Sequence, residues 1–329
     1  MPQSPIKPRH AVGLDLIADD MAEVDRQIAR RLSTSVPLVG QVSSYIISSG
    51  GKRLRPAILL LVCGALGYKL PARFNLAAVV EFIHTATLLH DDVVDESAMR
   101  RGRPTANQRF GNAASVLVGD FLYSRAFQMM LECKNMRVME ILADATNVIS
   151  EGEVQQLLNV RDTGLNEQGY LQVIRSKTAK LFEASSRLGA VLASGSAPIE
   201  QACADYGQAL GTAFQVIDDV LDFDGIAGEM GKNLGDDLRE GKVTLPIIIA
   251  LQRASPLEAE ILRRAVLDGH DVDLEQVVSI VKSLGAIDAS RAAAAREAQR
   301  ATDAMNMFPR TSYRDCLLEL PVQLLERRS

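Results

Sequence analysis

Apolar and polar residues follow one another along this chain with the period of helices rather than of strands. In segments such as LDLIADDMAEVDRQIARRL, VMEILADATNVISEGEVQQLLNV and EQGYLQVIRSKTAKLFEASSRLGAVLAS, apolar residues recur at steps of three and four. This spacing gives a helix one buried face. Two-residue alternation and hairpin dipeptides, the signals of β-strands, are almost absent. The sequence therefore predicts an all-α protein of roughly ten or more helices.

Polar segments rich in glycine and proline mark the connections between these helices. They are SSGGKRLRP, RGRPTANQRFGN, RDTGLNEQ, SGSAPIE and DGIAGEMGKNLGDDLREGK. None of them is a low-complexity linker, and no internal repeat is visible. We predict a single domain over residues 1–329, in which the final amphipathic portion, from about residue 256 to 329, forms peripheral helices. The segment AAAAREAQRATDAM within this portion is strongly helical by propensity.

Composition and charge narrow the range of functions. A net charge of −5 argues against a nucleic-acid partner. Four cysteines without CxxC spacing are typical of neither a zinc site nor a disulfide framework. The N-terminal segment lacks the apolar stretch of a signal peptide, and the runs AILLLVCGALG and LPIIIAL are well short of the ~20 residues of a membrane span. We therefore expect a cytoplasmic protein with no transmembrane segment, and we expect both runs to be buried helices.

Two acidic clusters follow apolar helical runs and repeat one spacing. They are Asp91, Asp92 and Asp95 in LLHDDVVDESAMRRGRPT, and Asp218, Asp219 and Asp222 in FQVIDDVLDF. Carboxylates four residues apart share a helix face and repel each other unless a cation lies between them. Hard oxygen ligands of this kind suit Mg²⁺, which typically binds one or two carboxylates together with substrate phosphate oxygens. The clusters therefore predict a magnesium site.

Other interpretations of the acidic clusters fit less well. One cluster alone is also typical of a solvated helix end, but two copies after buried-looking runs favour a functional site. The loop of an EF-hand, with its central glycine and terminal glutamate, is missing. A nuclease-type two-metal site uses similar carboxylates, but the basic residues nearby indicate a different partner.

Basic residues lie close to both clusters. The turn GGKRLRP carries Lys52, Arg53 and Arg55 before an apolar helix, where glycines and a helix N-terminus favour an anion. The glycine pattern of a P-loop is absent, and an ordinary basic surface turn remains an alternative. Further cations are Arg100, Arg101, Lys177 and Lys232.

Two further polar residues share the helix faces of the carboxylates. His84 lies two turns before Asp91, and Gln215 lies one turn before Asp218. A histidine at such a position is also typical of a satisfied core residue, so a phosphate-binding role for His84 is one of two interpretations. The carboxylates can bind Mg²⁺, and the metal can bind one diphosphate. The basic residues beside them can bind a second diphosphate without a metal. The pattern predicts a site that joins two diphosphate esters.

Together these segments resemble the trans-isoprenyl diphosphate synthase family. LLHDDVVDESAMRRGRPT is similar to its first aspartate-rich motif, GGKRLRP to its isopentenyl-binding turn, and GTAFQVIDDVLDF with GKNLGDDLREGKVTLP to its second aspartate-rich region. The resemblance extends from about residue 42 to residue 251. It implies the isoprenoid synthase fold, a single large helical bundle around a central cavity, in a homodimer. It is greatest to long-chain bacterial members, which implies a product of eight isoprene units that supplies a quinone side chain.

The resemblance also implies the reaction and its residues. The reaction is the Mg²⁺-dependent 1′-4 condensation of isopentenyl diphosphate onto an allylic diphosphate such as farnesyl diphosphate, repeated with trans geometry. Carried onto this chain, the ligands of isopentenyl diphosphate are Lys52, Arg55, His84 and Arg101, and those of the allylic diphosphate are Arg100, Lys177, Thr178, Gln215 and Lys232. The principal metal ligands are Asp91, Asp95 and Asp218, supported by Asp92, Asp219 and Asp222. The residues expected to carry catalysis are Asp91, Asp92, Asp95, Lys177, Asp218 and Asp219.

The length of the product is expected to depend on Ala86 and Thr87. Ala86 stands five residues before Asp91, where short-product members of the family carry a bulky aromatic residue. Small residues here imply a passage open to a long chain, and a long apolar product implies a transient membrane contact for its release.

The sequence is also compared with three alternative functions. A terpene cyclase ionises a single diphosphate and usually carries a different second metal motif. A head-to-head condensing enzyme of the squalene type is disfavoured for similar reasons. A non-catalytic subunit of a heteromeric synthase tends to lose its aspartates, and none is lost here.

Overall fold

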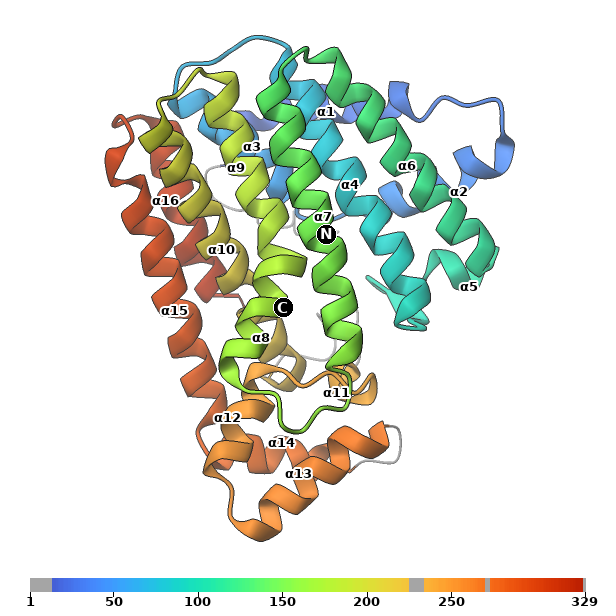
Figure 1. The fold of residues 1–329 in the computed structure, drawn as a ribbon, viewed down its shortest axis with the longest axis vertical. Helices are drawn as coiled ribbons and strands as arrows, with labels where there is room; N and C mark the ends of the chain where they lie inside the picture. Colours follow the sequence, from blue (N-terminus) through green and yellow to red (C-terminus); the bar gives the residue numbers. More distant parts are fainter. Residues whose placement is uncertain (1–13, 225–233, 270–272, 328–329) are drawn as a thin grey trace, which may run out of the picture.

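The structure is a computed structural model that describes residues 14–224, 234–269 and 273–327 (Figure 1). Its first half runs through the 3₁₀ turn η1 and helices α1 to α7. Their bounds are η1 Leu14–Ile17, α1 Ala18–Arg31, α2 Pro37–Ser48, α3 Leu54–Ala65, α4 Ala72–Val94, α5 Ala106–Phe110, α6 Asn112–Glu132 and α7 Met136–Leu158. A hairpin of two-residue strands, β1 Met99–Arg100 and β2 Arg103–Pro104, separates α4 from α5.

The second half contains the longest helix and the C-terminal helices. Its elements are α8 Glu167–Ile174, the π-helical segment η2 Arg175–Ala179, α9 Lys180–Leu192, α10 Ala197–Asp224, α11 Asp236–Arg239 and α12 Leu245–Arg253. They continue with α13 Pro256–Asp268, α14 Leu274–Ser283, α15 Ala286–Ala304, the 3₁₀ turn η4 Met305–Met307 and α16 Ser312–Leu325. The all-α fold expected from the sequence is thus confirmed.

The core of the bundle forms where the most apolar helix is surrounded. Helix α3 is apolar nearly all round, and its residues Ala57–Cys63 are almost fully buried, as expected for a helix without a solvent face. It packs against α4, α9 and α16. The other apolar run, in α12, is also buried from Leu245 to Ala250. Both runs therefore form buried helices, as predicted.

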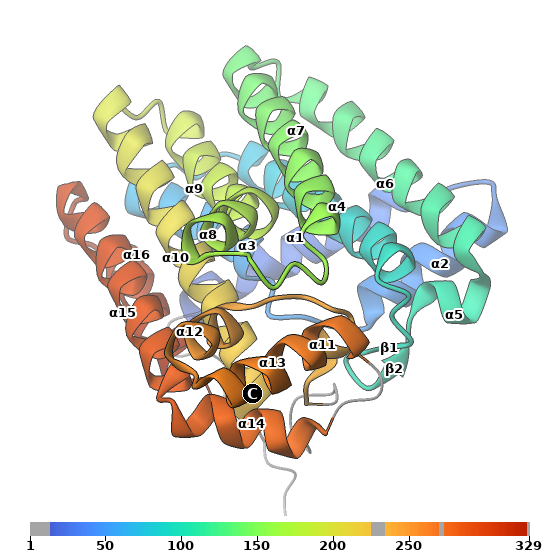
Figure 2. The same ribbon diagram turned by 60° about the horizontal axis from the view of Figure 1, so that its bottom comes forward.

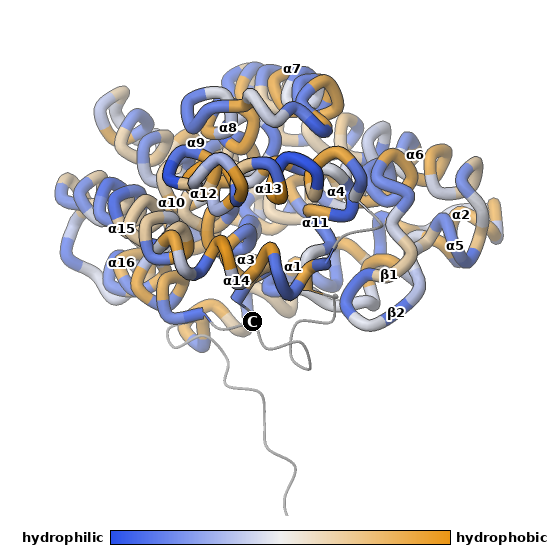
Figure 3. The backbone as a smooth tube through the Cα atoms, turned by 90° about the horizontal axis from the view of Figure 1, so that it is seen from below, coloured by the Kyte–Doolittle hydropathy of each residue, from blue (hydrophilic) through white to orange (hydrophobic). Residues whose placement is uncertain are grey.

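Most other helices are amphipathic and arranged around this core. Figure 3 shows hydrophilic and hydrophobic positions following one another round each helix. Helix α6 packs on α4, α7 on α9, and α15 along α10. Helices α11 to α14 gather at one end of the bundle, at the bottom of Figure 1 and in front in Figure 2. This end also holds the last turns of α4 and α10, where the two acidic clusters lie.

Of the C-terminal helices, which we expect at the periphery of the domain, α15 and α16 also pack closely on the central helices. Ala294, Ala298 and Ala301 of α15 are buried because small side chains let this helix pack closely along α10. Helix α16 packs against α3, and Gly64 of α3 lies beside the ring of Tyr313. Both helices are therefore part of the bundle that holds the acidic clusters.

No helix among the described residues is both long and apolar enough to cross a bilayer.

Candidate active site

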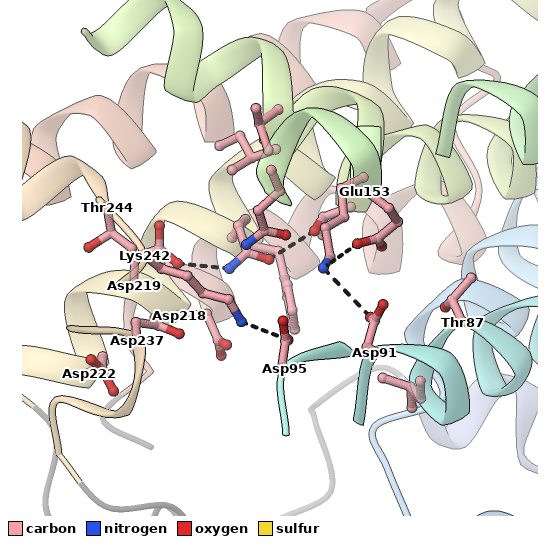
Figure 4. Close-up of a pocket in the computed structure, with 18 of the residues that line it drawn as sticks. Thr87, Asp91, Asp95, Glu153, Asp218, Asp219, Asp222, Asp237, Lys242 and Thr244 are labelled. Atoms are coloured by element: carbon pink, nitrogen blue, oxygen red, sulfur yellow. Dashed lines mark hydrogen bonds and ion pairs between the residues drawn. The ribbon is translucent and has the colours of Figure 1, made fainter. Parts of the chain in front are cut away.

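Aspartates of both acidic clusters line one cavity of about 740 Å³. Its walls come from the start of α3, the C-terminal half of α4, α7, the run from α8 to α9, and α10 with α11. Figure 4 shows Asp91 and Asp95 approaching from one side, and Asp218, Asp219 and Asp222 from the other. The fold therefore brings together two carboxylate groups that are far apart in the sequence.

In the first cluster, two of the three aspartates face the cavity. Asp91 and Asp95 line it, since residues four apart share a helix face. Asp92 lies about 100° round the helix and does not line the cavity. It is fully buried, and its Oδ1 accepts a hydrogen bond from Arg100 Nε at 2.8 Å and lies 2.7 Å from Arg100 Nη2 as an ion pair. In this arrangement Asp92 orients Arg100, which differs from the metal-supporting position expected of it.

All three aspartates of the second cluster line the cavity. Asp219 is buried and accepts hydrogen bonds from the Tyr170 hydroxyl at 2.5 Å and from Gln215 Nε2 at 2.7 Å. Burial and the charge of Asp237 raise the pKa of the Asp219 carboxyl well above its usual value. Asp222 accepts a hydrogen bond from the backbone of Asp236, which ties the start of α11 to the end of α10.

Two lysines lie between the carboxylates. Lys177 Nζ lies 2.5 Å from Glu153 and 3.7 Å from Asp91, and Lys242 Nζ lies 2.7 Å from Asp95 (Figure 4). Burial and the charge of Asp91 raise the pKa of the Glu153 carboxyl to about 7. Negative charge is thus concentrated where water screens it poorly, so this end of the cavity favours added cations.

Basic side chains line the part of the cavity that α3 and the β1–β2 hairpin supply. Arg55 Nη1 lies 3.2 Å from His84 Nε2, and its guanidinium lies over the Phe182 ring at 4.4 Å. Burial and the charge of Arg55 lower the pKa of His84 well below its usual value, so the ring is neutral. Because Arg55 can only donate, Nε2 accepts and Nδ1 carries the proton. His84 can therefore donate one hydrogen bond to an anion.

Lys52 and Arg101 complete this basic part of the cavity. Arg101 lies at the tip of the hairpin, and a Cβ at Gly51 would lie 2.8 Å from its Nη1. A larger residue at position 51 would therefore displace this guanidinium from its place in the cavity. Burial and the charge of Arg327 lower the pKa of the Lys52 ammonium group to about 8. The neighbouring Arg53 also lines the cavity and is paired there with Glu81, which lies 3.0 Å from its Nη1.

The remaining predicted residues are distributed as follows. Thr178 Oγ1 donates to Gln215 Oε1 at 2.9 Å, so these two residues meet across α10 and η2. Arg100 also lines the cavity. Lys232 lies outside the described residues. Thr87 lines the cavity, whereas Ala86 is fully buried in α4 and does not.

The cavity lining also includes residues that the sequence reasoning did not name, and five of them have side chains that can hydrogen-bond or carry charge close to the predicted site. They are Glu153, Tyr170, Asp237, Lys242 and Arg327. Asp237 and Lys242 fall within GKNLGDDLREGK, so their acidic and basic character was a usable signal. Arg327 follows α16 and lies 3.5 Å from Asp218. No local pattern could have linked it to a cluster more than a hundred residues earlier.

The carboxylate oxygens of the cavity suit a divalent cation that is bound by the protein and by a phosphate-bearing ligand together. Among the described residues, no group of three or more His, Cys, Asp or Glu side chains could hold a metal ion by itself. The carboxylates lie instead on two facing helices, with space between them. Mg²⁺ commonly takes one or two carboxylates and completes its shell with water and phosphate oxygens. The arrangement suits such binding better than a closed protein cage.

The chain is similar to proteins of known family over most of its length. The family model for polyprenyl synthetase matches residues 36–284. Octaprenyl diphosphate synthase of Escherichia coli (strain K12) is 48% identical over 307 residues, which cover 93% of this chain and 95% of that protein. All-trans-nonaprenyl-diphosphate synthase (geranyl-diphosphate specific) of Rhodobacter capsulatus is 42% identical over 312 residues, 94% of this chain and 96% of that protein.

A solved structure is similar over the whole fold. It is the polyprenyl synthase of Caulobacter crescentus CB15, described as complexed with calcium and isoprenyl diphosphate. It superposes with a TM-score of 0.94 at 43% identity, covering 98% of this chain and 100% of that chain.

Proposed function

The chain belongs to the polyprenyl synthetase family and is a prenyltransferase that elongates trans-prenyl chains, and from this premise we propose its substrates, metal and product. It adds isopentenyl diphosphate repeatedly to an allylic diphosphate such as farnesyl diphosphate, with Mg²⁺ as the divalent metal. The main product is octaprenyl diphosphate, for a quinone side chain. The observation that carries this proposal is that carboxylates on α4 and α10 face each other across one cavity whose neighbouring wall is basic.

The metal lies at the carboxylate end of the cavity. Asp91 and Asp95 on α4 and Asp218 on α10 are its principal ligands, and Asp219 and Asp222 support the second side. When bound, Mg²⁺ supplies positive charge that stabilises the departing diphosphate. Lys177, Thr178 and Gln215 hold the allylic diphosphate beside it, together with Arg100, whose guanidinium Asp92 orients.

Isopentenyl diphosphate binds at the basic end without a metal. Lys52, Arg55 and Arg101 supply charge, and the neutral His84 donates from Nδ1. Arg forks match diphosphate oxygens in pairs. The double bond of this substrate is thereby held toward the allylic carbon that bears the leaving group.

The chemical step follows from these positions. The allylic C–O bond breaks, and its electron pair leaves with the diphosphate. The isopentenyl double bond then forms the new C–C bond to the allylic cation, and the proton lost from the adjacent carbon passes to a diphosphate oxygen. Apolar residues such as Leu88, Ile174 and Phe214 line the cavity and exclude water that would quench the cation.

The chain acts as a homodimer through α6. This helix exposes Val116, Leu117, Phe127 and Leu131, with Leu117 66% exposed. An apolar row of this kind on an outer helix is typical of an interface. Analytical ultracentrifugation of the purified chain tests this proposal, and a monomer at micromolar concentration would contradict it.

The product is a long lipid, and its release involves a transient membrane contact. Burial is worth about 0.8 kcal/mol per CH₂ group, so each added isoprene unit makes release into water harder. We expect detergent or lipid vesicles to raise the steady-state rate. A rate that detergent does not change would count against this contact.

The assay that tests the function uses labelled isopentenyl diphosphate, farnesyl diphosphate and Mg²⁺. We expect all-trans elongated products from the chain alone, no product after chelation of the metal, and recovery of activity when Mg²⁺ is restored.

Asp91→Ala and Asp218→Ala are expected to lower turnover by a factor of about 10² to 10³ or more. Asp205→Ala is the matched control, because Asp205 is an exposed residue of α10. Failure of the chain alone to elongate would overturn the proposal.

A further inference from the structure

The helix that carries Lys177 and Thr178 changes its winding where they lie. Between α8 and α9, residues Arg175–Ala179 form the π-helical segment η2. Such segments are rare, cost stability, and occur frequently at functional sites. Consecutive side chains of an α-helix point about 100° apart, whereas the wider π turn brings neighbours closer in direction. Lys177 and Thr178 are consecutive, and both line the cavity.

Two glycines on neighbouring helices contact η2 more closely than any other residue type allows. A Cβ at Gly152 of α7 would lie 2.8 Å from both Lys177 N and Ser176 Cβ. A Cβ at Gly211 of α10 would lie 2.6 Å from Ala179 Cα and 2.9 Å from its Cβ. Ordinary contacts between carbon atoms are about 3.5–4.0 Å. The close neighbours are backbone atoms or side-chain stems, which cannot rotate away.

The two contacts connect η2 to the helices whose side chains meet Lys177 and Thr178. On α7, Glu153 follows Gly152 directly, and it lies 2.5 Å from Lys177 Nζ. On α10, Gln215 lies one turn after Gly211 and accepts the hydrogen bond of Thr178 at 2.9 Å. Each glycine therefore sets the distance between one cavity residue of η2 and its partner.

We propose that Gly152 and Gly211 are positioning residues for the allylic diphosphate. They hold η2 between α7 and α10 so that the Lys177 ammonium group and the Thr178 hydroxyl reach the same diphosphate. The inference rests on the proposed function, since it takes that diphosphate as the ligand of both side chains.

A methyl group at either position moves η2 away and weakens allylic binding. At Gly211 it would also lie 3.1 Å from Phe182 Cβ, and the Phe182 ring packs on Arg55 of the isopentenyl end. At Gly152 its closest contacts would be with Lys177 and Ser176, so Gly152→Ala leaves the isopentenyl end unaffected.

A third glycine provides a control for general packing damage. A Cβ at Gly189 of α9 would lie 2.7 Å from Val62 Cβ and 3.0 Å from Leu59 O. This contact between α9 and α3 is as close as those of η2, but neither Gly189 nor Val62 lines the cavity. Gly189→Ala thus costs stability in the same way without displacing Lys177 or Thr178.

The test compares Gly152→Ala, Gly211→Ala and Gly189→Ala with the wild type. We expect the first two to raise KM for farnesyl diphosphate about tenfold, and we expect Gly152→Ala to change KM for isopentenyl diphosphate less than about twofold. Gly189→Ala is expected to lower Tm but to leave both KM values within about twofold. Calorimetric binding of inorganic diphosphate with Mg²⁺ gives the same comparison without turnover, with weaker binding expected for the η2 variants alone.

Deletion of Ser176 tests the geometry without adding an atom at the helix contacts. One residue fewer allows a continuous α-helix, so we expect a folded protein that loses diphosphate binding. The inference is overturned if both KM values rise equally in Gly152→Ala, if Gly189→Ala raises KM for farnesyl diphosphate as much as the η2 variants do, or if the deletion variant binds diphosphate normally. A wild type that does not elongate would instead contradict the proposed function, which separates the two failures.

Discussion

At Lys52, burial and the charge of Arg327 lower the pKa of the ammonium group to about 8. The cation is therefore present below this pH and is lost as the pH rises through it. Because Lys52 binds isopentenyl diphosphate in the proposed site, we expect kcat/KM for that substrate to fall above about pH 8. Lys52→Arg is expected to remove the inflection, since a guanidinium stays charged. An identical profile in this variant would show that another group titrates.

Asp92 differs in role from its neighbours Asp91 and Asp95. It is buried away from the cavity and orients Arg100 through a hydrogen bond and an ion pair. We therefore expect Asp92→Asn to raise KM for the allylic diphosphate, while the Mg²⁺ concentration at half-maximal rate changes little. Asp95→Asn is the comparison, and it should shift the Mg²⁺ dependence. Equal shifts in both variants would place Asp92 among the metal ligands.

At the scale of secondary-structure elements, the sequence predicts best the helices with strong apolar periodicity. The runs in α3 and α12 and the helices that carry the aspartates follow from spacing alone. Helix geometry also predicts that the Asp92 side chain points to a different face from Asp91 and Asp95. Its pairing with Arg100, however, depends on a hairpin of two-residue strands that local sequence patterns do not specify. The π segment could not be predicted either, because close contacts of α7 and α10 accompany it and its own sequence is ordinary for a helix.

Helix α15 gives a test of how closely the C-terminal helices pack on α10. Ala294 is fully buried, whereas the adjacent Ala295 is exposed. We expect Ala294→Leu to lower the free energy of unfolding by about 1–3 kcal/mol through overpacking, and Ala295→Leu to change it by less than about 0.5 kcal/mol. Urea denaturation measures both values. Equal stabilities would mean that α15 is as peripheral as its alanine-rich sequence suggested.

At the scale of the whole molecule, a growing prenyl chain needs a path that leads beyond the cavity. The cavity of about 740 Å³ has to hold two diphosphates and their metal as well as the prenyl tail. Beyond it, the space between α4 and α6 is filled by apolar side chains, among them the fully buried Met129 and Met130. Methionine is flexible and repacks easily. We infer that the tail advances along α4 by displacing such side chains.

Ala86 is the position at which this path can be blocked. It is fully buried in α4, next to the cavity residue Thr87, so a larger side chain would fill the space into which the tail must move. We expect Ala86→Tyr to shorten the main product from about eight isoprene units to about three or four, while the aspartates still support condensation. Ala86→Val is expected to give intermediate lengths, because it adds less volume. Chromatography of dephosphorylated products measures the length, and total isopentenyl incorporation and Tm separate a blocked path from a damaged fold. A folded, active Ala86→Tyr enzyme with products of wild-type length would place the limit deeper between α4 and α6, near Phe127 to Met130.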